Sequence, residues 1–212
     1  MELNLKQKVY DGIIDRMVKG EILPGSIITE KQVIDYFNVS KSPVREAMLE
    51  LCKDDVLKVI PRCGYQVNQV STRTVFEIID VRLMIELANF RDICKKITNV
   101  QIDQIFSKIE EIQKTPSKPV WMANDNNQNF HLELIKLSSN EVLVGILKKL
   151  LELYSRAYAQ MYEAGTISKE KTTDNLHTLF LNAWKERNYE EAEKYLREDI
   201  ISSLEQARLL KY

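Results

Sequence analysis

Residues 38–55 read NVSKSPVREAMLELCKDD, and this stretch decides the fold of the first third of the chain. Its apolar residues recur at the spacing of one buried helix face, namely Val44, Ala47, Met48 and Leu51. Ser42 is expected to be the N-cap and Pro43 the first helical residue, where the missing N–H of proline costs nothing. The helix then runs to Lys53, and Arg45 is turned outward at its start.

Two further helices and a hairpin surround this stretch. Apolar residues at helical spacing predict a helix over residues 4–19, ended by Gly20. Thr29 followed by Gln32 is a capping-box pattern, which opens a short helix over residues 30–37. Strand-forming runs at 57–60 and 65–67 are separated by a turn in which Gly64 supplies backbone freedom. Three helices and a hairpin predict a winged helix-turn-helix over residues 1–70.

The rest of the chain carries only helical patterns. Beyond the polar stretch 69–73 the strand signal disappears, and a second domain is expected over residues 74–212. The periodicity predicts six helices, at residues 74–97, 100–113, 120–137, 141–164, 169–187 and 189–210. This domain is therefore expected to be an all-α bundle, and the fold class is mainly α.

Composition excludes several classes of protein. Hydrophobic residues make up 44% of the chain and charged residues 29%, which excludes a disordered or collagen-like protein. No apolar run is long enough for a membrane span or a signal peptide, so a cytoplasmic protein is expected. The 3 cysteines lack CxxC spacing, which argues against a disulfide framework or a zinc cluster. A net charge of -1 gives no general attraction to nucleic acid, so DNA binding depends on individual cations.

The segment around Arg45 resembles the GntR family of bacterial transcription regulators. The residues that carry the resemblance are Gly20, Pro24, Gly25, Glu30, residues 39–48 and Gly64. The resemblance implies contacts to double-stranded operator DNA from Lys31, Ser40, Lys41, Ser42 and Arg45, and an approach of Gly64 to the DNA groove or backbone. Arg45 can form a bidentate contact with guanine, whereas Lys31 and Ser40 suit phosphates. Lys41 stands where the family usually has Arg, which weakens fork-like base recognition there.

The second domain resembles the FadR-type (FCD) branch of the same family, through residues 82–86, 127–131, 138–140 and 177–183. In metal-binding members of that branch, an Asp and a His four residues apart bind an ion together with His residues on two later helices. These positions fall here on Asn127, His131, His177 and Asp199. The spacing is compatible, because residues 127 and 131 share a helix face and residues 177 and 199 are separated by a helix, a turn and a return helix.

Two of these four positions depart from the branch's pattern. Asn127 stands where an Asp is usual, and Asp199 stands where a His is usual. Losing one imidazole and gaining an amide oxygen makes the donor set harder, which weakens nickel and zinc relative to manganese and magnesium. A divalent ion (Zn, Ni, Mn or Mg) is therefore one expectation. The alternative is a metal-free pocket in which the two histidines form hydrogen bonds.

These features predict a ligand-responsive transcription regulator, in most such cases a repressor, that binds a palindromic operator as a homodimer. The expected effector is a small organic acid or sugar acid, whose carboxylate can meet Arg82, although Arg82 can equally pair with Glu86 one turn later. A metal-free regulator with an acyl or other apolar effector remains an alternative. A metal-dependent enzyme is a further one, but no acid or base partner is found beside His131 or His177 in the sequence, so no enzyme is expected.

Overall fold

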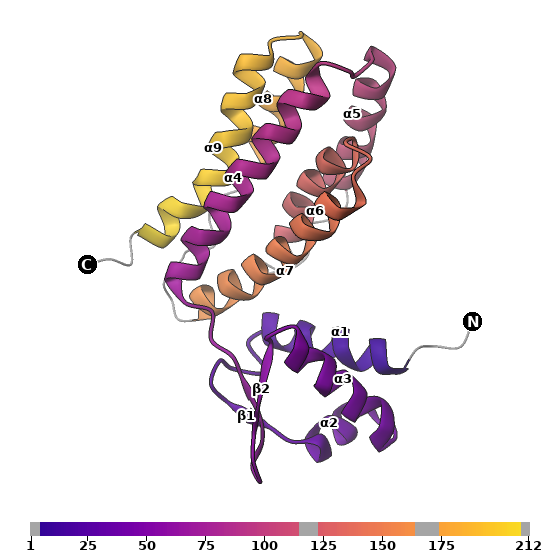
Figure 1. Ribbon diagram of the computed structural model, residues 1–212, viewed down its shortest axis with the longest axis vertical. Coiled ribbons are helices and arrows are strands. Elements are labelled where there is room, and N and C mark those ends of the chain that lie inside the picture. The colour runs from indigo at the N-terminus through magenta and orange to yellow at the C-terminus, as the bar shows by residue number, and fades with distance from the viewer. Residues whose placement is uncertain (1–4, 115–122, 164–173, 209–212) are drawn as a thin grey trace. The chain divides into compact units, whose positions relative to one another are not determined.

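The computed structural model describes residues 5–114, 123–163 and 174–208, and the chain divides into two compact units, Met1–Val70 and Ser71–Tyr212 (Figure 1). None of the helices in the described ranges combines the length and the apolar composition that crossing a membrane requires.

The first unit is a three-helix domain with a small sheet. Its elements are α1 (Leu5–Val18), β1 (Ile27–Ile28), α2 (Glu30–Phe37), α3 (Lys41–Lys53), β2 (Leu57–Ile60) and β3 (Gly64–Val67). The strands are antiparallel in the order β1-β3-β2, with Tyr65 opposite Ile28 on one side and Val59 on the other. The predicted winged helix-turn-helix is confirmed. Strand β1 was not predicted, because two residues are too short to show an alternating pattern.

The inner face of α3 is the centre of this unit's core. Its four predicted apolar residues have no exposed surface, and they pack with residues of α1 and α2, such as Ile13 and Val33. The predicted capping box of α2 is present, since the Thr29 hydroxyl accepts from the Gln32 N–H and the Gln32 side chain accepts from the Thr29 N–H. Helix α3 is therefore fixed in place with its other face outward.

Helix α3 begins earlier than the sequence indicated. Its N-cap is Ser40 rather than Ser42, and Pro43 is the third helical residue. Proline is tolerated at this position because the first N–H groups of a helix have no acceptor within it. The Ser42 hydroxyl donates instead to the Glu46 carboxylate, at 3.0 Å. The prediction that Ser42 caps the helix was wrong, because proline fits anywhere in the first turn and does not fix the start.

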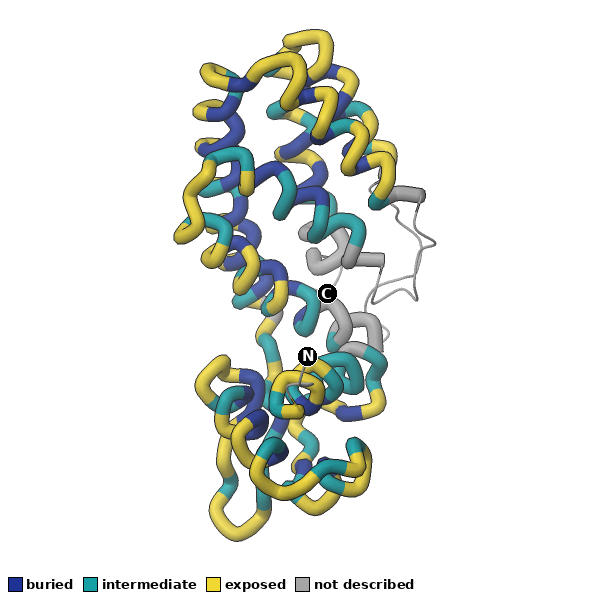
Figure 2. Tube along the Cα trace, turned by 90° about the vertical axis from the view of Figure 1, so that its right-hand side faces the viewer, coloured by how far each residue is buried: buried dark blue, intermediate teal, exposed yellow. Residues whose placement is uncertain are grey.

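The second unit is an all-α bundle in the described ranges, as predicted. Its helices are α4 (Thr72–Cys94), α5 (Asn99–Lys114), α6 (Ala123–Lys136), α7 (Glu141–Glu163), α8 (Asp174–Lys185) and α9 (Tyr189–Arg208). Helix α9 packs on α4 and α8, while α4 also contacts α6 and α7. The buried residues of these helices face the interior of the bundle (Figure 2). The parts of the predicted helices at 120–122, 164, 169–173 and 209–210 lie outside the described residues.

Aromatic rings fill one part of this bundle. Phe90 of α4 packs against Phe180 and Trp184 of α8, with ring centroids 5.2 and 5.4 Å apart. Phe130 of α6 joins the cluster through an edge-to-face contact with Phe180 at 5.4 Å. The cluster holds α4, α6 and α8 together beside the polar groups described below.

Candidate DNA interface and metal centre

The first turn of α3 presents polar side chains to solvent. Ser40, Lys41, Ser42 and Arg45 are all exposed, because the opposite face of the helix is buried in the core. Lys31, in the first turn of α2, is exposed as well. A helix N-terminus carries partial positive charge and free N–H groups, and these favour nearby phosphates. The five side chains predicted from the sequence to contact DNA are thus exposed in the first turns of α2 and α3.

Carboxylates lie beside two of these donors. Lys41 Nζ is 3.8 Å from Glu30 Oε2, and Ser42 donates to Glu46. The Lys41 side chain is 71% exposed, and an exposed pair of this kind contributes little to stability. A phosphate can therefore replace Glu30 as the partner of Lys41 at small cost.

The wing turns at residues 61–63, and Gly64 begins the strand that follows. Gly64 has a φ of 132°, and a Cβ built on it would lie 2.6 Å from the carbonyl oxygen of Ile28. Glycine is therefore required where β3 passes β1, whatever this residue does toward DNA. The exposed tip is formed by Pro61, Arg62 and Cys63. The role of Gly64 in the sheet was missed because β1 itself was missed.

A cluster of buried polar and charged groups lies inside the bundle. Its members come from four helices and are at most 9% exposed: Arg82, Glu86, Asn89, His131, His177 and Asp199. Burying a charge is costly unless it is paired or bound to a metal ion. A cluster of this size in a small bundle therefore points to a specific role.

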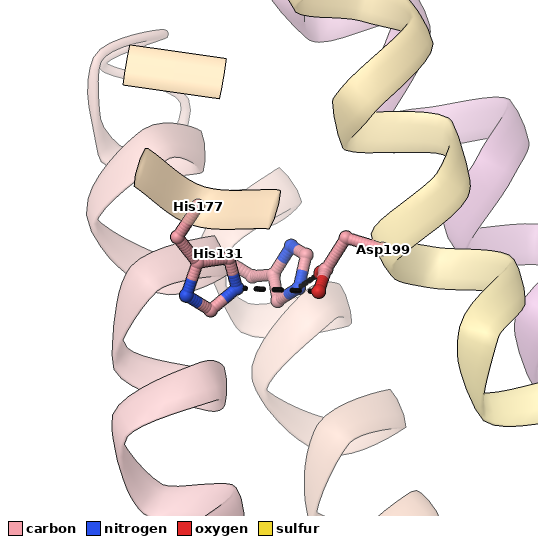
Figure 3. Close-up of side chains that lie close together, drawn as sticks. All are labelled: His131, His177 and Asp199. Carbon is pink, nitrogen blue, oxygen red and sulfur yellow. Dashed lines mark ion pairs between the residues drawn. The ribbon is translucent and has the colours of Figure 1, made fainter. Parts of the chain in front are cut away.

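His131 is the centre of this cluster. Its Nδ1 lies 2.6 Å from Glu86 Oε2, and its Nε2 lies 2.7 Å from Asp199 Oδ2. His177 Nε2 approaches the other Asp199 oxygen at 3.3 Å and forms a hydrogen bond with Asn127 Oδ1 at 3.1 Å. Figure 3 shows both imidazoles turned toward the Asp199 carboxylate. All four positions named from the sequence come together.

The local sequence explains how these side chains are held. Asn127 and His131 lie one turn apart on α6 and share a face. The Phe130 ring stacks on the His177 ring with centroids 3.9 Å apart and an angle of 13°, which fixes the plane of that imidazole. Asp199 is followed on α9 by Ile200, which has no exposed surface. The cluster is therefore built on rigid, packed helices.

The charges of the cluster are strongly perturbed. Burial by itself would raise the pKa of Asp199, but the imidazoles of His131 and His177 beside it hold that pKa well below its usual value. Burial likewise opposes ionisation of Glu86, yet the Arg82 guanidinium and His131 bring its pKa below the usual value. For His131, burial favours the neutral form, but the carboxylates of Glu86 and Asp199 together outweigh burial, and the pKa of His131 is raised. The two carboxylates are anionic, and Arg82 is the only permanent cation in the buried cluster of described residues.

Four atoms of the cluster lack a hydrogen bond within the described ranges. They are Nη2 of Arg82, Nε2 of His131 and both carboxylate oxygens of Asp199. The 2.7 Å approach between His131 and Asp199 is an ion-pair distance without the angles of a hydrogen bond. Buried polar atoms are normally satisfied, so these call for a partner. One ligand atom from each of His131, His177 and Asp199 can be chosen so that all three lie within 4.8 Å of one another, and two imidazoles with a carboxylate fit a divalent ion.

Arg82 pairs with Glu86, one turn later on the same helix, as its spacing in the sequence allowed. Its Nε donates to Glu86 Oε1 at 2.7 Å, and both side chains are almost completely buried. Arg82 Nη2 is buried and has no hydrogen-bond partner among the described residues. The structure thus gives Arg82 one internal partner and leaves one donor for something else.

Glu86 was not predicted as a site residue. Its spacing from Arg82 suggested an intrahelical pair, but nothing in the sequence indicates that its second oxygen meets His131 on another helix. Only the packing of α4 against α6 brings these two residues together.

Comparison with known proteins gives the same division of the chain. Residues 5–67 match the gntR family of bacterial regulatory proteins, and residues 77–201 match the FCD domain. The transcriptional regulator YdhC of Bacillus subtilis (strain 168) is 27% identical over 196 residues, which cover 88% of this chain and 84% of the relative. The transcriptional repressor RspR of Escherichia coli (strain K12) is 23% identical over 211 residues, covering 98% of this chain and 90% of the relative.

The solved structure of E. coli McbR has the same fold, with a TM-score of 0.75 at 21% identity over 97% of this chain and 98% of that chain. The two named relatives are helix-turn-helix transcription regulators, and the matched domains are those of a regulator, which argues against the enzyme alternative. The chain therefore belongs to the GntR family, and it is a DNA-binding transcription regulator with a C-terminal FCD domain.

Proposed function

We propose that this regulator is a dimeric repressor whose FCD domain holds a divalent metal ion and responds to a small organic acid or sugar acid. The observation that carries the proposal is the meeting of Asn127, His131, His177 and Asp199 in the interior of the bundle, with polar atoms left unsatisfied. Repression is proposed by analogy with the relative RspR, which is named a repressor.

The donor set favours a hard or borderline divalent ion. The site offers two imidazole nitrogens, one carboxylate and one amide oxygen. This set suits manganese or magnesium better than a set with three imidazoles would, although zinc and nickel can also be bound by such a site. Arg82, the only permanent cation of the cluster among the described residues, is matched by Glu86, which leaves the charge of Asp199 for the ion. A bound divalent ion then outweighs the single charge of Asp199 and leaves one positive charge for an anionic effector.

A carboxylate effector follows from the same chemistry. Metal ions of this class accept six ligands, so four protein donors leave room for oxygen atoms of a second molecule. Arg82 Nη2 is a further donor that a carboxylate can use. Effector binding would change operator affinity through a coupling free energy between the two domains.

The DNA contacts are assigned to the first turns of α2 and α3 and to the wing. Arg45 is proposed to read a base in the major groove, and Lys31, Ser40, Lys41 and Ser42 to bind nearby phosphates or base edges. Gly64 is proposed to allow the wing to approach the groove. A palindromic operator then requires two such domains related by two-fold symmetry.

An apolar face of the bundle supports dimerisation. Val81 and Met84 on α4 and Val142 and Ile146 on α7 are exposed large apolar side chains, with Met84 at 70% and Val142 at 73%. Helices α4 and α7 contact each other, so these four residues, here called the α4–α7 face, belong to adjacent helices. A Cβ on Gly145 would meet nothing within 4 Å, which leaves space for a second backbone.

Opposite charges are exposed on the two helices of the α4–α7 face. Asp80 is exposed on α4, and Lys149 is exposed on α7. A symmetric dimer in which α4 of one copy meets α7 of the other would let these opposite charges attract each other. We assign this face to a second copy of the chain.

Metal content tests the proposed function most directly. Untagged protein, purified without chelator, is expected to contain about one equivalent of a divalent ion, which is lost in the His131→Ala/His177→Ala variant. Both proteins are then compared for binding to the DNA upstream of their own gene, to separate loss of metal from loss of fold. Wild-type protein that binds this DNA but holds no ion would overturn the metal site and favour the metal-free pocket with an apolar effector.

A further inference from the structure

Glu86 uses both of its carboxylate oxygens inside the bundle. Oε1 accepts from Arg82 Nε at 2.7 Å, and Oε2 lies 2.6 Å from His131 Nδ1. The Glu86 side chain is 3% exposed, so water does not compete for either contact. Each oxygen has a different partner, and both partners are almost completely buried as well.

The contact with Glu86 decides which nitrogen of His131 is available as a ligand. A carboxylate 2.6 Å from Nδ1 requires a proton on that nitrogen, since two lone pairs would repel each other. With its proton kept on Nδ1, the ring can offer a lone pair to an ion only from Nε2, the atom that faces Asp199. Histidines that bind metals commonly donate their other N–H to a carboxylate in this way, which fixes the ring and increases the basicity of the ligating nitrogen.

Arg82 keeps the Glu86 carboxylate in this position. Without the guanidinium, two buried carboxylates would flank a single imidazole, and neither of them would have a permanent counter-charge in the cluster. The Arg82 contact also occupies the oxygen that His131 does not use. Glu86 therefore acts on His131 from the side of the ring opposite to the ligand cluster.

We propose that Glu86 is a positioning residue of the metal site, and that it holds His131 in the form with Nδ1 protonated so that Nε2 binds the ion. This proposal rests on the metal site of the proposed function. It assigns Arg82 first to the support of Glu86, with only Nη2 left for an effector. Because Glu86 lies on α4, the helix that follows residue 70 in the chain, it also ties His131 to that helix.

The test uses two charge-neutral double variants. Arg82→Met with Glu86→Leu removes the carboxylate and the guanidinium together, so the net charge near the ion is unchanged. Arg82→Met with Glu86→Gln does the same but keeps an oxygen that can accept from Nδ1. Replacing a buried ion pair with apolar groups is often tolerated, whereas removing one partner strands a charge. Glu77→Gln, in an exposed pair with Arg73 on the same helix, is the control.

Binding of Mn²⁺ and Zn²⁺ is measured by calorimetry on the full chain, with thermal unfolding to verify the fold. The Leu variant is expected to lose about 10- to 100-fold in affinity, the Gln variant to recover part of that loss, and the control to match the unchanged chain. Long-range ¹⁵N spectra of the zinc form are expected to show His131 protonated on Nδ1 and bound through Nε2.

The same measurements distinguish failure of the Glu86 role from failure of the metal site itself. If the unchanged chain binds the ions and the folded Leu variant binds them within about twofold, Glu86 does not position His131, while the metal site stands. A zinc complex in which Nδ1 of His131 is the bound nitrogen overturns the proposal equally. If the unchanged chain binds neither ion, the metal site itself fails and the proposal falls with it.

Discussion

His131 of α6 and Asp199 of α9 contact each other inside the bundle, with Nε2 and Oδ2 separated by 2.7 Å. The position of Asp199 is occupied by a third histidine in the metal-binding pattern that the sequence resembles. Aspartate at this point brings an anion to two imidazoles, since His177 Nε2 is 3.3 Å from the same carboxylate. The substitution changes both the charge and the hardness of the donor set.

Asp199→His is expected to change the preference for metal ions. Three imidazoles and an amide oxygen are softer than the present donors, so the ratio of Zn²⁺ to Mn²⁺ affinity should rise by about tenfold or more, on the order of 1.4 kcal/mol. Competition titrations with both ions measure the ratio. Asp92→His, at an exposed position that pairs with Lys96, adds a histidine outside the bundle and should leave the ratio unchanged. An unchanged ratio in Asp199→His would show that residue 199 is no ligand.

Local patterns predicted most of the fold. The Thr29–Gln32 capping box and the buried face of α3 depend on residues a few positions apart, and both were read correctly. Strand β1 exists only because Ile28 pairs with Tyr65, a distant residue, so its two residues carry no signal of their own. The start of α3 was misplaced because Pro43 is compatible with several positions in a first turn.

The candidate site likewise has residues that the sequence predicted and one that it did not. The four candidate metal positions were found through a resemblance, and the spacing of Asn127 and His131 predicted that these two share one helix face. Glu86 was missed because its contact with His131 depends on how α4 and α6 pack, which no local pattern records. Long-range contacts of side chains therefore limit what the sequence alone predicts here.

Cysteine reactivity tests the approach of the wing to DNA. Cys63 is exposed at the wing tip, next to Gly64, whereas burial raises the pKa of Cys94 to about 11. Because the thiolate is the reactive form, iodoacetamide should modify Cys63 first and Cys94 last, as followed by mass spectrometry. Operator DNA is expected to slow the reaction at Cys63 only. DNA of unrelated sequence at the same concentration is the control, and equal rates with and without operator would contradict a wing close to the groove.

Val142→Glu tests the α4–α7 face as the dimer interface. The side chain is 73% exposed in the single chain, so the substitution should leave the fold intact, but it places carboxylates in an apolar contact between copies. Analytical ultracentrifugation should then report a monomer, and operator affinity should fall because each half-site is bound separately. Val100→Glu, at a 65% exposed position on α5, is the matched control and should remain a dimer. A dimeric Val142→Glu protein would place the interface elsewhere.

Arg45→Ala tests the reading of DNA by α3. If Arg45 makes a bidentate contact with a base, its loss should cost roughly 1 to 3 kcal/mol, or about 5- to 150-fold in operator affinity, and relax discrimination at one base pair of each half-site. Lys53→Ala removes the same charge from the last turn of α3, away from the N-terminal turn, and should weaken binding only slightly and equally for all sequences. Fluorescence anisotropy with operator and with single-base variants, at two salt concentrations, separates the two effects. Equal losses in both variants, with unchanged base preference, would mean that Arg45 contributes only charge, and the assignment of base reading to the first turn of α3 would have to be withdrawn.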